Sequence, residues 1–70
     1  MNFEIKYNPI EGSSIKRWSI ETPLEEKFQI INQLDNCYEL YDMDKNERLT
    51  KLSKFEDCLK WIREYTKYDW

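Results

Sequence analysis

Seventy residues, a formal net charge of −3 and a complete lack of histidine narrow what this chain can be. A chain of this length forms one domain, residues 1–70, with a thin core and no deep substrate cavity, and its acidic balance disfavours direct binding to nucleic acid. No stretch approaches the ~20 apolar residues of a membrane helix and no signal-peptide core is evident, so we expect a cytoplasmic protein that does not act on membranes.

The first third of the chain predicts a β-hairpin. In residues 2–8, Phe3, Ile5 and Tyr7 alternate with polar residues, which is typical of a half-buried strand. A loop around the only glycine follows, and residues 15–21 form the second strand.

The segment 23–34 carries two signals for a helix. Thr22-Pro23-Leu24-Glu25 combines a good N-cap residue, a proline at the first helical position and a capping-box glutamate. Apolar residues then recur at helical spacing at Leu24, Phe28, Ile31 and Leu34. The alternative is a strand over residues 28–31. We favour the helix because the start signal and the periodicity agree.

The second half predicts a strand around residues 38–41, an Asp-rich turn at 42–46, and a strand at 47–52. Ser53 and Glu56 form a second capping box. The final helix buries the stripe Phe55, Cys58, Leu59 and Ile62.

The predicted fold class is α+β, with the order β-β-α-β-β-α and a four-stranded antiparallel sheet that carries two helices on one face. The halves 2–34 and 37–68 resemble a ββα internal repeat, although any two hairpin-plus-helix units look similar. The other sheet face is expected to be open and polar. It would present Glu4, Lys6, Arg17, Ser19, Glu39, Tyr41, Arg48 and Thr50.

No residue pattern indicates catalysis. Without histidine, Ser and Cys lack their commonest activating base, and one glycine cannot build a phosphate-binding loop. The segment Asp42–Asn46 begins like a calcium loop, but Glu47 and Ser53 stand where that loop needs glycine and glutamate. Cys37 and Cys58 form no C-x-x-C pair. We therefore predict a protein that is not an enzyme, with no catalytic residue, metal or cofactor.

Two surface features are candidates for binding a partner. The first is an acidic turn made of Glu39, Asp42, Asp44 and Glu47, with Asp35 nearby. The alternative is that this turn is ordinary solvated surface. The second is an aromatic flank on the last helix, made of Trp61, Tyr65, Tyr68 and Trp70. The alternative is that these rings cover a sheet edge or seal a homodimer.

In size, acidity and lack of catalytic residues the chain is similar to phage-encoded nuclease inhibitors and anti-CRISPR proteins, although no motif carries a family match. The sequence thus predicts a non-enzymatic protein-binding module, of an inhibitor type from a phage or mobile element, that occupies a partner's basic, nucleic-acid-binding surface. The alternative is a nucleic-acid-binding module that uses Lys6, Arg17, Tyr41 and Arg48 on the open sheet face.

Overall fold

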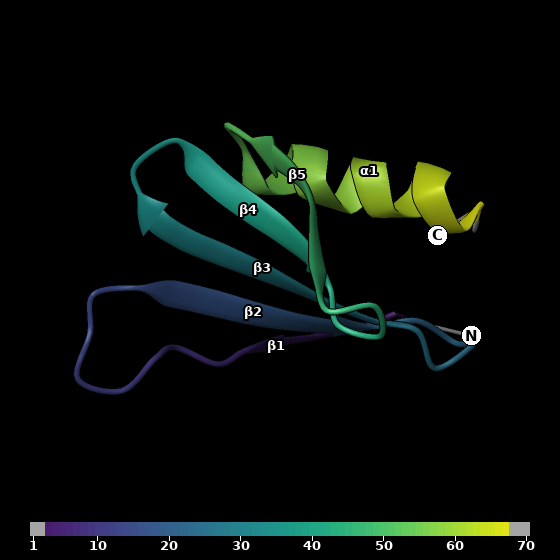
Figure 1. Ribbon diagram of the computed structural model, residues 1–70, viewed down its shortest axis with the longest axis horizontal. Coiled ribbons are helices and arrows are strands. Elements are labelled where there is room, and N and C mark those ends of the chain that lie inside the picture. The colour runs from purple at the N-terminus through teal and green to yellow at the C-terminus, as the bar shows by residue number, and fades with distance from the viewer. Residues whose placement is uncertain (1–2, 68–70) are drawn as a thin grey trace.

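Five antiparallel strands and one helix make up residues 3–67, the part of the chain that the computed structural model describes. The elements are β1 (Glu4–Tyr7), β2 (Lys16–Glu21), β3 (Lys27–Leu34), β4 (Cys37–Asp42), β5 (Glu47–Leu52) and α1 (Phe55–Thr66). Neighbours in the sheet are neighbours in the chain, in the order β1-β2-β3-β4-β5. Short turns suffice for such a meander. The helix α1 runs across one face of the twisted sheet (Figure 1).

The core lies between α1 and the sheet. Because successive side chains of a strand point to opposite faces, every second residue of β2, β3 and β4 lies on the side of the sheet that α1 covers. The register places Ile20 opposite Phe28 and Ile30 opposite Leu40. Six apolar residues are at most 2% exposed: Ile20, Phe28, Ile30, Leu40, Cys58 and Ile62. Burial of a large apolar side chain contributes about 1.5–3 kcal/mol, so these residues supply much of the stability of so small a chain.

The predicted helix at 23–34 is wrong, and with it the predicted fold class. Residues 27–34 form the central strand β3, so the order is β-β-β-β-β-α, with a five-stranded sheet and one helix. The supposed stripe is not buried as a unit, since Leu24 is 64% and Leu34 is 70% exposed. The burial instead alternates along the strand, which pairs with β2 on one side and with β4 on the other.

Residues 22–26, which resemble the start of a helix, form the turn between β2 and β3. Thr22 is buried, and its Oγ1 atom accepts a hydrogen bond from the backbone N–H of Glu26 at 3.1 Å. The N–H of Glu25 bonds to the carbonyl oxygen of Thr22 at 2.9 Å, and Glu25 has a left-handed φ of 65°. The same side-chain acceptor that would cap a helix therefore reverses the chain here.

The other predicted elements are confirmed, with adjusted ends. Four strands and the final helix form close to their expected positions. Glu56 and Asp57 lie in the first turn of α1, where negative charge suits the helix dipole. The second capping box does not form, because Lys54 is the N-cap residue and it makes no side-chain cap bond. The halves 2–34 and 37–68 end in different elements, a strand in the first and a helix in the second.

The open face of the sheet differs from the prediction at β5. A register shift between Leu40 and Tyr41 places Thr50 opposite the buried Leu40, so Thr50 lies on the α1 side of the sheet. Lys51 pairs with Glu39 and takes the place expected for Thr50 on the open face. Strand β3 adds Lys27, Gln29 and Ile31 to this face, opposite Glu21, Ser19 and Arg17 of β2.

Candidate functional site

The side chain of Asp42 shapes the turn between β4 and β5. Although it belongs to the predicted acidic turn, only 5% of Asp42 is exposed. Its Oδ1 atom accepts hydrogen bonds from the backbone N–H groups of Asp44 at 2.9 Å and Lys45 at 3.2 Å. Asp side chains commonly stabilise turns in this way. Asp42 therefore fixes the turn and leaves little carboxylate surface for a partner.

Tyr65 of α1 connects the helix to this turn. Its hydroxyl group donates to Oδ2 of Asp42 at 3.5 Å and accepts from Nζ of Lys45 at 3.4 Å. Its ring meets Phe28 edge-on, with centroids 5.9 Å apart, while 38% of the residue stays exposed. The hydrogen bond to Tyr65 raises the pKa of Lys45 above 10.5, and the nearby carboxylates of Asp42 and Glu47 add to this effect. The turn and the last helix thus form one connected unit.

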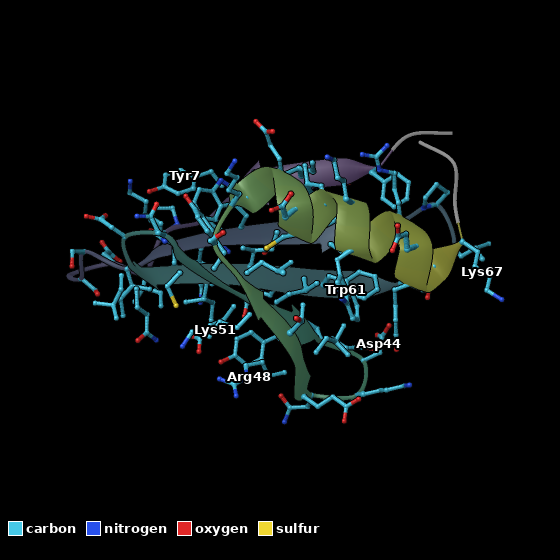
Figure 2. The ribbon with its side chains drawn as sticks, turned by 90° about the horizontal axis from the view of Figure 1, so that it is seen from above. Tyr7, Asp44, Arg48, Lys51, Trp61 and Lys67 are labelled. Atoms are coloured by element: carbon cyan, nitrogen blue, oxygen red, sulfur yellow. The ribbon has the colours of Figure 1, made fainter. Side chains whose placement is uncertain are left out.

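The predicted aromatic flank begins with a stacked pair of rings. Trp61 and Tyr65 lie one helical turn apart, with centroids 5.1 Å apart and planes inclined by only 20°. Trp61 is half-buried and also packs against the core. Figure 2 shows Trp61 on the side of α1 that faces the sheet's β4–β5 side in that view. Tyr68 and Trp70, the other two predicted residues of this flank, lie outside the described residues.

The β2–β3 turn lies at the same end of the sheet as the β4–β5 turn. The N–H of Met43 donates to the carbonyl oxygen of Lys27 at 3.0 Å, and the N–H of Lys27 donates to Oδ2 of Asp44 at 3.3 Å. The two turns are therefore joined through the first residue of β3. Leu24 is 64% and Met43 is 43% exposed at this end.

We call this region the turn-end surface. It combines apolar side chains, two aromatic rings and more carboxylates than cations. Its residues are Leu24, Glu25, Glu26, Met43, Asp44, Lys45, Glu47, Trp61 and Tyr65. Sequence reasoning missed Leu24, Glu25 and Glu26 because it assigned them to a helix. The usable signal was Pro23 in a short, mostly polar segment that ends in a glutamate pair, which suits a turn as well as a helix start.

The predicted acidic cluster is divided by the fold. Glu39 lies on the open face, where Arg48 holds its carboxylate at 3.2 Å and only 18% of its side chain is exposed. Asp35 lies in the β3–β4 turn, at the opposite end of the sheet. Of the predicted acidic residues, Asp44 and Glu47 remain exposed at the turn-end surface.

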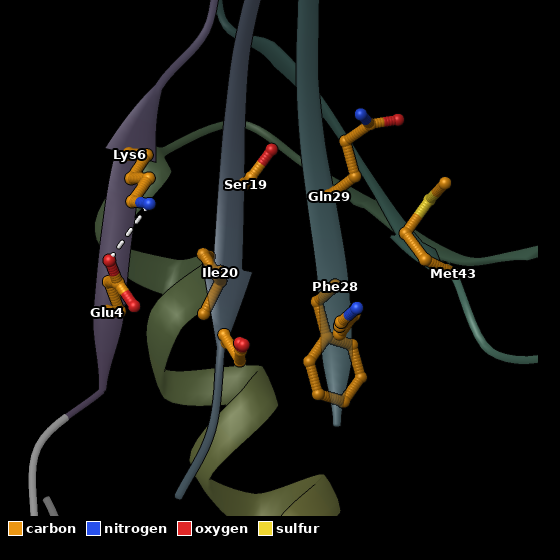
Figure 3. A pocket seen from close by; sticks show the side chains of 9 residues that line it. Glu4, Lys6, Ser19, Ile20, Phe28, Gln29 and Met43 are labelled. Carbon is orange, nitrogen blue, oxygen red and sulfur yellow. Dashed lines mark ion pairs between the residues drawn. The ribbon is translucent and has the colours of Figure 1, made fainter. Parts of the chain in front are cut away.

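The open face is a second candidate surface. One row across the sheet reads Lys6, Ser19, Gln29, Tyr41, Arg48. The β1 side of this face has a shallow hollow of about 340 Å³, bordered by Glu4, Lys6, Lys27 and Met43 (Figure 3). Across the whole face the cations are Lys6, Arg17, Lys27, Arg48 and Lys51, and the anions are Glu4, Glu21 and Glu39. This face is therefore more basic than the chain as a whole.

Residues 3–67 contain no cluster of three or more His, Cys, Asp or Glu side chains that could hold a metal ion. Cys37 and Cys58 are both free thiols. Burial, with a smaller contribution from the charge of Asp57, raises the pKa of Cys58 to about 11, so this thiol is protonated at neutral pH. Within the same described range, no helix has both the length and the apolar character needed to cross a membrane.

No protein-family model matches the chain, and neither a curated protein nor a solved structure matches it significantly. The predicted inhibitor type and phage origin therefore gain no support from known proteins, and we do not carry them further. The turn-end surface and the open face are therefore the two candidate functional surfaces.

Proposed function

We propose that this chain is a non-enzymatic protein-binding module of the cytoplasm, and that its turn-end surface binds a basic protein. The observation that carries the proposal is the stacked pair of Trp61 and Tyr65, which the Asp42 turn holds through the hydroxyl group of Tyr65. Leu24 and Met43 are exposed in the two turns at the same end of the sheet. Trp and Tyr are the residue types most often found to dominate binding energy at protein interfaces.

The aromatic pair is held in place before any partner arrives. The ring of Tyr65 is supported by Phe28, and its hydroxyl group bonds to Asp42 and Lys45. Side chains that are already ordered lose less conformational entropy when a complex forms. This rigidity distinguishes the turn-end surface from scattered exposed apolar residues, which are normal on soluble proteins.

The charge of the turn-end surface indicates the kind of partner. The turn-end surface has four carboxylates, on Glu25, Glu26, Asp44 and Glu47, and one ammonium group of its own, on Lys45, while Lys27 lies at its border. Complementary charge speeds the encounter of two proteins and excludes partners of like charge. A basic surface, such as one that otherwise contacts nucleic acid, fits this pattern.

The test compares two charge-reversal variants as baits in affinity capture from a lysate of the producing cell. The test variant is Glu25→Lys/Glu47→Lys at the turn-end surface. The control is Glu11→Lys/Asp35→Lys at the other end of the sheet; it alters net charge equally, and all four side chains are exposed. We expect a protein retained by the wild type and the control to be lost with the test variant. Equal retention by all three baits, with circular dichroism showing each folded, would refute the proposal.

The apolar part of the surface has its own test. Leu24→Ser removes a side chain that is 64% exposed, so folding should be preserved. We expect weaker capture of the same protein. Leu34→Ser is the matched control, because Leu34 is 70% exposed at the opposite end of the sheet, and it should capture the protein as well as the wild type does.

A second candidate function rests on the basic character of the open face. Single-stranded nucleic acid binds to sheets that combine aromatic rings for stacking with cations for phosphates, and Tyr41 lies here between Gln29 and Arg48. The assay is fluorescence polarisation with a labelled single-stranded oligonucleotide at several salt concentrations. Affinity that falls steeply with salt, and that drops on Tyr41→Ala, supports this function; no binding at low salt excludes it.

A further inference from the structure

The outer edge of β1 is open to another strand. Within residues 3–67, β1 pairs only with β2. The N–H of Asn8 donates to the carbonyl oxygen of Arg17 at 2.7 Å. Because alternate residues of an antiparallel strand turn their backbone groups to the same side, Lys6 and Glu4 also face β2. The backbone N–H and C=O groups of Ile5 and Tyr7 therefore point away from the sheet.

The side chains of β1 are also unusually exposed. Ile5 is 41% and Tyr7 is 56% exposed on the α1 side of the sheet. Tyr7 packs against Trp18, with ring centroids 5.4 Å apart. On the open face, Glu4 and Lys6 form an ion pair of 3.1 Å in which both side chains stay more than half exposed (Figure 3).

The two edges of the sheet are protected differently. Proteins usually block exposed edges with bulges or with unopposed charges. The β5 edge has both, with a register shift next to Tyr41 and the exposed cations Arg48 and Lys51. The β1 edge has no register shift against β2, and its single lysine is accompanied by a glutamate two residues away.

We propose that the β1 edge pairs with the β1 edge of a second copy of this chain, antiparallel and with the two-fold axis at Ile5. In this register each Ile5 faces Ile5 of the second copy and exchanges two backbone hydrogen bonds with it. Glu4 of each copy then lies opposite Lys6 of the other, so two pairs of opposite charges cross the interface.

The charges select this register over its neighbours. Backbone groups that face the second copy occur at every second residue of β1, so the register between the two strands can change only in steps of two residues. Each such step moves the two-fold axis by one residue, from Ile5 to Glu4 or to Lys6. An axis at Glu4 places the two Glu4 carboxylates opposite each other, and an axis at Lys6 places the two Lys6 ammonium groups together. Like charges directly opposite each other destabilise a sheet. Parallel pairing of two β1 edges turns the second copy over, so that its Glu4 and Lys6 lie on the opposite face of the joined sheet and no pair of opposite charges crosses the interface.

Such a dimer joins two five-stranded sheets into one sheet with both helices on the same face. The two-fold axis places the two turn-end surfaces at opposite ends of the joined sheet. A single short strand contributes only a small interface, at the low end of the sizes seen in specific complexes. We therefore expect a dimer that dissociates on dilution.

Sedimentation velocity over a concentration series measures the dimer dissociation constant and tests the proposal. The substitutions are made at exposed residues outside the core. Lys6→Glu and Glu4→Lys each replace both crossing pairs by like charges, and each should raise the dimer dissociation constant roughly tenfold or more. The exchange Glu4→Lys/Lys6→Glu should restore the wild-type constant. A mixture of the two single variants should form a heterodimer that neither forms alone. Lys51→Glu, at the other edge, is the control and should leave the constant unchanged.

Two results would overturn the proposal. One is a wild-type chain that stays monomeric throughout the series. The other is a dimer whose dissociation constant is unchanged by Lys6→Glu and Glu4→Lys, or whose wild-type constant does not return in the Glu4→Lys/Lys6→Glu exchange. In either case the contact between the two copies lies elsewhere. Ile5→Pro gives a separate test, since it removes an N–H group that points outward and not one that bonds β2; a folded variant that still dimerises as the wild type does contradicts edge pairing.

Discussion

Replacement of Asp42 by alanine should destabilise the protein markedly, although the residue stands at the end of β4, next to a surface turn. The substitution removes the acceptor of two backbone hydrogen bonds, from Asp44 at 2.9 Å and from Lys45 at 3.2 Å. Hydrogen bonds to a charged group contribute about 1.5–3 kcal/mol each where water is excluded. Here Asp44 and Lys45 are exposed, so water can replace part of each bond. We therefore expect a loss of about 2 kcal/mol for both bonds together.

The assay is thermal unfolding followed by circular dichroism. For a domain of this size, 1 kcal/mol corresponds to a shift of roughly 4–8 °C in Tm, so Asp42→Ala should lower Tm by about 8–16 °C. Asp42→Asn keeps an oxygen acceptor and should lose about half as much. An Asp42→Ala variant with the wild-type Tm would refute the structural role. A stable Asp42→Asn variant that no longer captures the partner would show that the carboxylate is itself a binding group.

Three further predictions address the core, the β2–β3 turn and the thiols. Phe28→Ala should cost about 3–5 kcal/mol in chemical denaturation, because it opens a cavity beneath α1; a loss below ~1 kcal/mol would contradict the core assignment. Thr22→Val keeps the shape but removes the acceptor for the N–H of Glu26 and should cost about 1 kcal/mol, whereas unchanged stability would argue against that bond. At pH 8 a thiol reagent should modify half-buried Cys37 rapidly and buried Cys58 only on unfolding; fast modification of both would contradict the burial of Cys58.

The raised pKa of Cys58 also predicts a pH dependence of stability. The thiol keeps its proton in the folded chain up to about pH 11, whereas its ordinary value is 9.0. The contribution of this group is therefore complete below pH 9 and is lost as the pH rises toward 11. Cys58→Ala should reduce the decline in denaturation midpoint over that interval, and an identical decline in both proteins would contradict the shift.

The elements that sequence reasoning found are those with a complete local pattern. Strands β1, β2 and β4 alternate in polarity over most of their length, β5 follows an Asp-rich turn signal, and α1 shows its stripe from Phe55 to Ile62. The segment 24–34 satisfies two patterns at once, since Phe28 belongs to both a helical stripe and an alternating strand. The choice between them depends on partners outside the segment, because β3 pairs with β2 over residues 27–32 and with β4 over residues 28–34. Tertiary pairing of this kind overrides local propensity.

The candidate site was predictable in part for the same reason. The spacing of Trp61 and Tyr65 places them on one flank of any helix, and they do stack. The acidic cluster did not survive as a unit, because Glu39 acquires Arg48 as a partner and Asp42 turns inward. Those partners are set by the strand register and the turn geometry, and neither can be predicted from composition and local spacing. Glu25 enters the site only because β2 and β3 form a hairpin.

The most direct test of the turn-end surface as a binding site is an amide NMR titration of the labelled chain with the protein that the wild type captures. Shift changes should concentrate at residues 24–27, 43–47 and 61–65, around the stacked rings of the turn-end surface. Changes confined to the open face, at Ser19, Gln29 and Tyr41, with none near Tyr65, would contradict this assignment.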